Sequence, residues 1–202
     1  MAVTDRVTSG DASSGAMARG KGAESVGSAR KHGCDHLFFI GFLGAGKSTL
    51  ARNLGGMFNR RFVDTDRLVE RRSGRTVREI FEREGEGRFR VLETQALATL
   101  SGERSLLVSC GGGIVETPEN IELMHEMGYC VYLDGDIGDS LRQIRRSDTR
   151  PDFRSAEHAA GLLEHRRPLY RRAADLTVDI RGKSFTEVSY AVAEMLLERG
   201  LL

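Results

Sequence analysis

A glycine-rich stretch followed by a lysine has the spacing of a phosphate-binding loop. Residues 41–49 read GFLGAGKST and match the pattern G-x-x-x-x-G-K-[ST] in full. Glycines let the backbone curl so that its N–H groups converge on phosphate oxygens, and the following helix points its positive end at the same anion. Lys47 can then reach the β- and γ-phosphates, and Ser48 can hold Mg²⁺. A glycine-rich turn without a ligand is the alternative, but the apolar run 36–40 before the loop favours nucleotide binding.

Asp64 is the last residue of the second candidate strand, 61–64, and Asp66 follows two residues later. In an open parallel sheet the carboxyl ends of the strands form the ligand crevice. Acids at i and i+2 of an extended segment point the same way. One can reach Mg²⁺ directly or through water, and the other can accept a hydrogen bond from a substrate hydroxyl or take its proton. Capping of the next helix is the alternative, and it explains one acid well but two poorly.

Three consecutive glycines, 111–113, follow the third apolar run, 105–109. Because they carry no side chains, a ligand can lie directly against their backbone. A flexible turn is the alternative, but a turn rarely needs three glycines after an apolar strand. The triplet therefore predicts one wall of a binding site.

Two arginines have the chemistry to bind a carboxylate. Arg90 lies three residues before Glu93 on a predicted amphipathic helix, so the two share a face. Arg166 lies in the segment HRRPLY. The planar fork of arginine fits a carboxylate with two hydrogen bonds. Taken singly, each arginine fits a solvated surface charge better, so their weight comes from the whole pattern of motifs.

A basic loop forms the last candidate part of the site. Arg145, Arg146 and Arg150 cluster in the segment RRSDTRPDF, among turn residues. A basic loop near phosphates can act as a lid that supplies charge to the transition state. A solvated basic loop explains the spacing equally well.

These groups can meet only on a scaffold that brings strand ends together. Short apolar runs alternate with helical patterns, which predicts a parallel sheet covered by helices on both faces. The helical pattern between the second and third runs is longer than one crossover needs, so residues 65–102 are expected to include a helical insertion. A further helix is expected to begin at Pro118 and end at Gly128. The candidate strands are 36–40, 61–64, 105–109, 129–133 and 175–179.

Length and composition restrict the class of protein. The chain has 202 residues, of which 40% are apolar and 29% charged, and a formal net charge of +1. This describes one globular domain and argues against a nucleic-acid binder with a large basic surface. No apolar run is long enough to span a membrane. The three cysteines form no CxxC pair, which favours a reducing, cytoplasmic setting.

The first 33 residues differ from the rest of the chain. Residues 1–33 are rich in Gly, Ser and Ala and lack apolar periodicity. Such a segment cannot bury enough surface to offset the entropy lost on ordering, so we expect a disordered extension. An organellar transit peptide fits less well because Asp5, Asp11 and Glu24 add acidic charge.

Taken in order, the motifs resemble those of shikimate kinases. The resemblance runs from about residue 36 to the C-terminus and covers the loop 41–49, the DTD segment, an FR-x-x-E helix, the three glycines, an RP lid and an R-x-PLY helix. It implies an α/β fold of the P-loop NTPase type, similar to nucleoside monophosphate kinases. The implied domain, 34–202, has three α/β/α layers with a five-stranded parallel sheet, a small helical substrate-binding insertion (about 65–102) and a lid (about 145–160).

The resemblance also implies an activity and roles for residues. The activity is phosphorylation of the 3-hydroxyl of shikimate by ATP with Mg²⁺, a step towards chorismate and the aromatic amino acids, in a monomeric cytoplasmic enzyme without nucleic-acid or membrane partners. The implied catalytic residues are Lys47, Asp66 and Arg150. The implied metal ligands are Ser48 and Asp64. The implied ATP-binding residues are Gly44, Ala45, Gly46, Lys47, Ser48, Thr49, Arg146, Arg150 and Lys183. The implied shikimate-binding residues are Asp66, Arg90, Glu93, Gly111, Gly112, Gly113 and Arg166.

The lid departs from the family pattern, and two other functions stay open. The lid reads Arg150-Pro151-Asp152-Phe153, where shikimate kinases usually carry Arg-Pro-Leu-Leu. Another P-loop small-molecule kinase, such as a gluconate-type or nucleotide kinase, would share the loop but not the carboxylate-binding arginines. A non-catalytic nucleotide-binding or partner-binding relative would bind ATP without acceptor-dependent turnover.

Overall fold

The structure is a computed structural model that describes residues 35–138 and 155–202. The predicted extension 1–33, Arg145, Arg146, Arg150 and most of the predicted lid lie outside the described residues. The elements in chain order are β1 (His36–Ile40), α1 (Lys47–Met57), β2 (Phe62–Asp64), α2 (Thr65–Ser73), α3 (Val77–Ala98), β3 (Leu107–Ser109), α4 (Pro118–Met127), β4 (Gly128–Asp134), α6 (Ala156–Ala173), β5 (Leu176–Asp179) and α7 (Phe185–Glu198), with 3-10 turns at Thr99–Gly102 and Ile114–Glu116.

The five strands form one parallel sheet in the order β2-β3-β1-β4-β5. All five predicted strands are confirmed, with boundaries within two residues of the apolar runs. β1 pairs with β3 and β4, so Phe38 lies beside Val108 on one side and Cys130 on the other. β2 and β3 lie on one side of β1, and β4 and β5 lie on the other, so the direction in which the chain adds strands reverses next to β1. Ligands of open parallel sheets bind at such a reversal, so the crevice is expected where β1 and β3 end.

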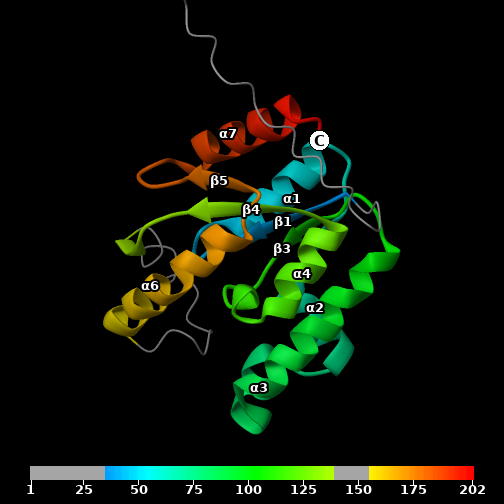
Figure 1. The fold of residues 1–202 in the computed structure, drawn as a ribbon, viewed down its shortest axis with the longest axis vertical. Coiled ribbons are helices and arrows are strands. Elements are labelled where there is room, and N and C mark those ends of the chain that lie inside the picture. The colour runs from blue at the N-terminus through cyan, green and yellow to red at the C-terminus, as the bar shows by residue number, and fades with distance from the viewer. Residues whose placement is uncertain (1–34, 139–154) are drawn as a thin grey trace, which may run out of the picture.

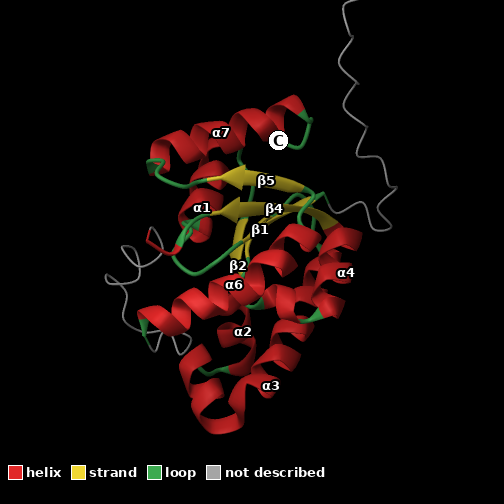
Figure 2. Ribbon diagram, turned by 60° about the vertical axis from the view of Figure 1, so that its left-hand side comes forward, coloured by secondary structure: helices red, strands yellow, loops and turns green. Residues whose placement is uncertain are grey.

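Helices cover both faces of the sheet, which confirms the three-layer architecture (Figures 1 and 2). Alternate residues of β1 enter opposite cores. Phe38 packs in the core beneath α4 and α6, while Phe39 packs in the core beneath α1 and α7. Burial on both faces explains why the strands read as continuous apolar runs. Among the described helices, none combines the length and the apolar character that crossing a membrane requires.

α2 and α3 form the predicted helical insertion and pack against each other around a third apolar cluster, Val69, Ile80, Phe89 and Ala96. The insertion lies below the sheet in Figure 1. α3 kinks at Gly85, whose φ of 81° and ψ of 174° are not helical. A positive φ of this kind costs glycine little, so the kink is built into the sequence.

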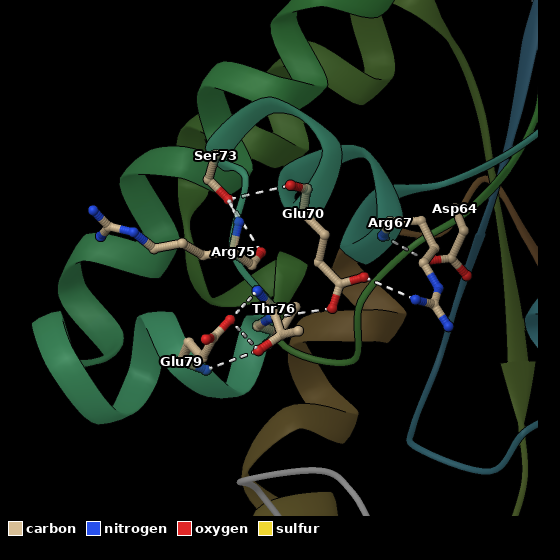
Figure 3. Close-up of polar contacts among 8 residues, drawn as sticks. Asp64, Arg67, Glu70, Ser73, Arg75, Thr76 and Glu79 are labelled. Atoms are coloured by element: carbon tan, nitrogen blue, oxygen red, sulfur yellow. Dashed lines mark hydrogen bonds and ion pairs between the residues drawn. The ribbon is translucent and has the colours of Figure 1, made fainter.

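Polar contacts fix the turn between α2 and α3 (Figure 3). Thr76 and Glu79 form a reciprocal capping box at the start of α3. The Glu70 carboxylate accepts hydrogen bonds from the Val77 N–H at 3.1 Å and from Arg67 at 3.0 Å. The insertion is therefore held as one rigid unit next to the end of β2.

α4 begins at Pro118 and its last residue is Met127, so Gly128 follows the helix as its C-cap, in agreement with the predicted end. Thr117 occupies the N-cap position without a side-chain hydrogen bond. Gly128 has an extended φ of 177°, so it does not end the helix through a left-handed conformation. A Cβ there would lie 2.0 Å from the His36 carbonyl oxygen, so glycine is required by the close approach of β1.

Candidate active site

The phosphate-binding loop joins β1 to α1 at the centre of the sheet. Gly44 and Gly46 have positive φ angles of 78° and 81°, which glycine adopts without strain. No side chain caps the first turn of α1, so its N–H groups stay available to an anion. The buried Lys47 amine donates hydrogen bonds to the carbonyl oxygens of Gly41 and Phe42, each at 2.8 Å. The predicted loop is therefore present and places Lys47 directly beneath it.

Three side-chain oxygens converge where α1, β2 and β3 meet. The Ser48 hydroxyl donates to Asp64 Oδ2 at 2.8 Å and lies 2.8 Å from the Ser109 hydroxyl. Hydroxyl and carboxylate oxygens are the ligands that Mg²⁺ prefers, and this cluster adjoins the phosphate-binding loop. Ser109, the last residue of β3, was not predicted, because the sequence does not show which strands are neighbours.

Asp66 does not occupy the extended segment that the sequence suggested. β2 ends at Asp64, and α2 already begins at Thr65, so the i, i+2 strand argument is wrong for this pair. Asp64 caps α2 by accepting a hydrogen bond from the Arg67 N–H at 3.3 Å. Asp66 belongs to the first turn of α2, yet both acids line the same cavity. Capping and a site role therefore coexist in Asp64.

A cavity of about 550 Å³ lies between the sheet edge and the helical insertion. Its wall includes Ser48, Asp64 and Asp66 at one end. Arg90 and Glu93 from α3 and the three glycines after β3 complete the same wall. These predicted metal, substrate and catalytic residues thus share one cavity that adjoins the phosphate-binding loop, whereas Lys47 and Arg166 are not among the residues that line it.

Arg90 is held by two acids of its own helix. Its Nη1 donates to Glu93 Oε2 at 2.9 Å, and its Nη2 donates to Glu86 Oε1 at 2.7 Å. The side chains of Arg90 and Glu93 are 14% and 1% exposed, whereas that of Glu86 is 53% exposed. The surface-charge interpretation of Arg90 is therefore wrong. Glu86 was missed, although its i, i+4 spacing to Arg90 was visible.

Burial disfavours the charged form of both Arg90 and Glu93, but neighbouring charges outweigh this effect only for Arg90. Burial raises the pKa of Glu93 to about 7; Arg90 opposes the shift, and Asp66 adds to it. Burial alone would lower the pKa of Arg90, but Glu93 and Glu86 outweigh it and the net pKa is raised. Arg90 therefore keeps its charge, while Glu93 can change its protonation near neutral pH.

Arg166 approaches the glycines from α6. It is 2% exposed, and its Nε donates to a carboxylate oxygen of Glu116. Its Nη1 would lie 3.6 Å from a Cβ on Gly112, and the Tyr170 hydroxyl donates to the Gly112 carbonyl oxygen. A solvated Arg166 is thus also excluded. Glu116 and Tyr170 were missed, because only the fold brings them to this position.

The three glycines leave room for the side chains of the site itself. A Cβ on Gly111 would lie 2.6 Å from Asp66 Oδ1, and one on Gly113 would lie 2.1 Å from Arg90 Nη2. The predicted side-chain-free wall is present at the cavity. Its glycines let Asp66 and Arg90 pack directly on the backbone.

A second cavity of about 400 Å³ lies on the other side of the phosphate-binding loop. Gly44, Ala45 and Gly46 line it together with the segment that joins β5 to α7. Lys183 lines this cavity, but its amine donates to the Asp179 carbonyl oxygen at 2.7 Å. Phe185, 39% exposed at the start of α7, also lines it and was not predicted.

The remaining predicted residues fall into two groups. Thr49 is exposed on the first turn of α1 and lines neither of these two cavities. Arg146 and Arg150 lie outside the described residues. Of the predicted lid, residues 155–160 are described: Ser155 caps α6 by accepting from the His158 N–H, and the helix follows.

Comparison with known proteins places this geometry in one family. The family model for shikimate kinase matches residues 43–197. The shikimate kinase of Halorhodospira halophila is 36% identical over 79% of this chain and 92% of its own length, and that of Synechococcus sp. (strain CC9902) is 38% identical over 79% and 85%. The structure of shikimate kinase from Acinetobacter baumannii in complex with shikimate aligns with a TM-score of 0.77 and 31% identity, covering 83% of this chain and 95% of that one. The structure from Aquifex aeolicus aligns at 0.71 and 32%, over 82% and 98%. On these matches the chain belongs to the shikimate kinase family.

Proposed function

We propose that this protein transfers the γ-phosphoryl group of ATP to the 3-hydroxyl of shikimate. The observation that carries the proposal is that Asp66, Arg166 and Arg90 approach the three consecutive glycines, each at a different glycine. Asp66 and Arg90 also line the cavity beside the phosphate-binding loop. Two guanidinium groups suit a carboxylate, and a carboxylate side chain suits ring hydroxyls. A small hydroxylated acid has both groups, so it matches this cavity at both ends.

The nucleotide end of the site follows from the loop. Backbone N–H groups at the start of α1 and the Lys47 amine would hold the β- and γ-phosphates. Ser48 and Asp64 would hold Mg²⁺, which neutralises phosphate charge when bound, and Ser109 would support Ser48. The cavity lined by Lys183 and Phe185 lies beside the loop and would receive the nucleoside. ATP phosphates and shikimate hydroxyls would then meet between Ser48 and Asp66.

Positioning would supply most of the catalysis, because phosphoryl transfer needs little covalent chemistry from the protein. Arg90 and Arg166 would fix the carboxylate of shikimate, which leaves the 3-hydroxyl facing Asp66. Asp66 would accept the hydrogen bond of that hydroxyl and take its proton. Lys47 would stabilise charge on the moving phosphoryl group. Arg150 is proposed to act there too, on the resemblance to the family alone.

A substrate panel tests the assignment. Purified protein with Mg²⁺ and ATP should release ADP when shikimate is added and should not respond to gluconate or nucleoside monophosphates. Phosphorus NMR of the product should place the phosphate on the 3-oxygen. Turnover with gluconate alone would favour the gluconate-type alternative, and ATP binding without any acceptor-dependent ADP release would favour the non-catalytic one.

Arginine variants test the observation on which the proposal rests. Arg90→Ala and Arg166→Ala should each raise the KM for shikimate strongly, because each removes charge-assisted hydrogen bonds to the carboxylate. The KM for ATP should change little, because neither arginine lines the nucleoside cavity. Unchanged shikimate kinetics in both variants would defeat the assignment. A monomeric state and a cytoplasmic location stay predictions.

A further inference from the structure

Close to Arg90 and Arg166, the acidic side chains that the structure describes outnumber the basic ones, while Arg52, Arg67 and Arg78 add positive charge to the lining of the cavity. Two guanidinium groups are in contact with or close to four acidic side chains: Arg90 and Arg166 against Asp66, Glu86, Glu93 and Glu116. Each guanidinium is thus already paired with an acid. A substrate carboxylate would add a further negative charge beside the buried Glu93 carboxylate, and like charges repel more strongly where water is excluded. The loss of one acidic charge would therefore favour substrate binding.

Geometry singles out Glu93 as that acid. Its side chain is 1% exposed, whereas those of Glu86 and Glu116 are 53% and 26% exposed and can be screened by water. Its Oε2 accepts from Arg90, but its Oε1 is buried without a hydrogen-bond partner among the described residues. An unpaired buried carboxylate oxygen is costly, and a proton on it removes that cost.

The unpaired oxygen lies in the same part of the site as a carboxylate of α2. Glu93 Oε1 and Asp66 Oδ1 lie 3.0 Å and 2.6 Å from one and the same point, the place that a Cβ on Gly111 would occupy. A protonated Oε1 can turn repulsion between these carboxyl groups into a hydrogen bond from Glu93 to Asp66. Asp66 would then stay ionised and able to accept from a substrate hydroxyl.

We propose that Glu93 Oε1 takes up a proton from solvent when the substrate carboxylate binds beside Arg90 and Arg166, and returns it when the product leaves. The inference rests on the proposed function, since it assumes an anionic substrate at this site. The O–H bond forms at Oε1 during binding and breaks during dissociation, so the proton is borrowed and no other reactant changes. Glu93 acts as a positioning residue that keeps the charge of the cavity constant.

The surrounding groups are consistent with this role. Glu93 is acted on by Arg90 on its own helix, by Asp66 from α2 and by Arg166 from α6. Burial and Asp66 hold the pKa of Glu93 near 7 before any substrate carboxylate arrives, and that carboxylate would raise it further. The adjacent Cys110 is fully buried and its pKa is raised by that burial, so it stays a neutral thiol and does not take over the titration.

Titration calorimetry tests the proposal directly. Shikimate is titrated into the wild-type protein at about pH 8 in phosphate, HEPES and Tris, whose ionisation enthalpies differ. The dependence of the observed heat on the buffer gives the number of protons bound. We expect uptake approaching one proton per shikimate, since most Glu93 is ionised beforehand at that pH. The shikimate methyl ester, which lacks the negative charge, should cause no uptake.

Variants assign the proton to its residue. Glu93→Gln should bind shikimate with no proton uptake, whereas Glu86→Gln, which alters the exposed partner of the same Arg90, should keep it. Should Glu93→Gln not fold, the wild type still decides: its Kd for shikimate should rise by up to about tenfold per pH unit above pH 7. Binding without buffer-dependent heat, a pH-independent Kd or equal uptake in Glu93→Gln would overturn this inference alone. Absence of shikimate binding to the wild type would instead remove the proposed function and, with it, this inference.

Discussion

We expect that replacing Gly113 by alanine displaces the guanidinium group of Arg90 without disturbing the fold. The new Cβ would lie 2.1 Å from Arg90 Nη2 and 2.6 Å from its Cζ, well inside van der Waals contact. The backbone at Gly113 has a φ of −95° and a ψ of 6°, which alanine adopts readily. Arg90 must therefore move, because its flexible end is the part that can yield.

The size of the effect follows from what Arg90 would lose. A hydrogen bond to a charged group contributes roughly 1.5–3 kcal/mol, so one lost contact with the substrate carboxylate raises the KM for shikimate about 10- to 100-fold. The KM for ATP and the thermal midpoint should stay nearly unchanged. A coupled ADP-release assay with shikimate and ATP varied separately measures both constants, and a thermal melt checks the fold.

Gly87→Ala is the matched control for this experiment. This variant also replaces a glycine by alanine, but on α3, where the added Cβ would meet no neighbouring group within 4 Å. Its shikimate kinetics should equal those of the wild type. A normal KM for shikimate in Gly113→Ala would refute the reasoning, because Arg90 would then hold no part of the substrate at its observed position.

Three further changes test separate parts of the structure. Lys47→Ala should lower kcat at least about 100-fold in the same assay, because the moving phosphoryl group loses its cation; retained activity would mean that the loop has been misread. Phe185→Ala should weaken ADP binding about tenfold in calorimetry if the ring stacks on the base, and should not affect tripolyphosphate, which lacks a base; equal losses for both ligands would exclude stacking. His36 is fully buried, accepts from the Leu106 N–H at 3.1 Å and has a pKa lowered by burial. The unfolded chain therefore binds the proton more readily than the folded protein, so His36 lowers the stability as the pH drops below about 6.5. Glu93, whose pKa is raised, acts in the opposite direction over this range, so the effect of His36 is measured as the difference in urea midpoint between the wild type and His36→Gln. The wild type should therefore lose stability relative to His36→Gln between pH 6.5 and 5, and a difference that does not change with pH would contradict this origin.

The sheet could be predicted from the sequence because its strands are buried on both faces. A continuous apolar run such as 36–40 can be recognised as a strand without any alternation of apolar and polar residues. The spacing of glycine and lysine after this run identifies the phosphate-binding loop. Strand ends were less certain. After the run 61–64, Asp66 was expected to be extended, but α2 begins at Thr65, two residues earlier than an extended Asp66 would allow. A boundary error of this size moved one side chain onto a helix without removing it from the cavity.

Contacts across long stretches of chain could not be predicted from local patterns. Glu116 and Arg166 are 50 residues apart, and only the packing of α6 against the turn after the glycines joins them. Ser109 reaches Ser48 because β1 and β3 are neighbours, and the sequence gives no strand order. Arg166 taken alone therefore fits a solvated charge, because its partner Glu116 is distant in the sequence, whereas both acids that pair with Arg90 lie within four residues of it.

A crystal structure of the protein with shikimate and ADP tests the central claim most directly. The account predicts the carboxylate of shikimate in contact with the guanidinium groups of Arg90 and Arg166, its ring against Gly112 and Gly113, and its 3-hydroxyl within hydrogen-bond distance of Asp66. Shikimate bound elsewhere, or Arg90 and Arg166 both turned towards bulk water, would contradict it.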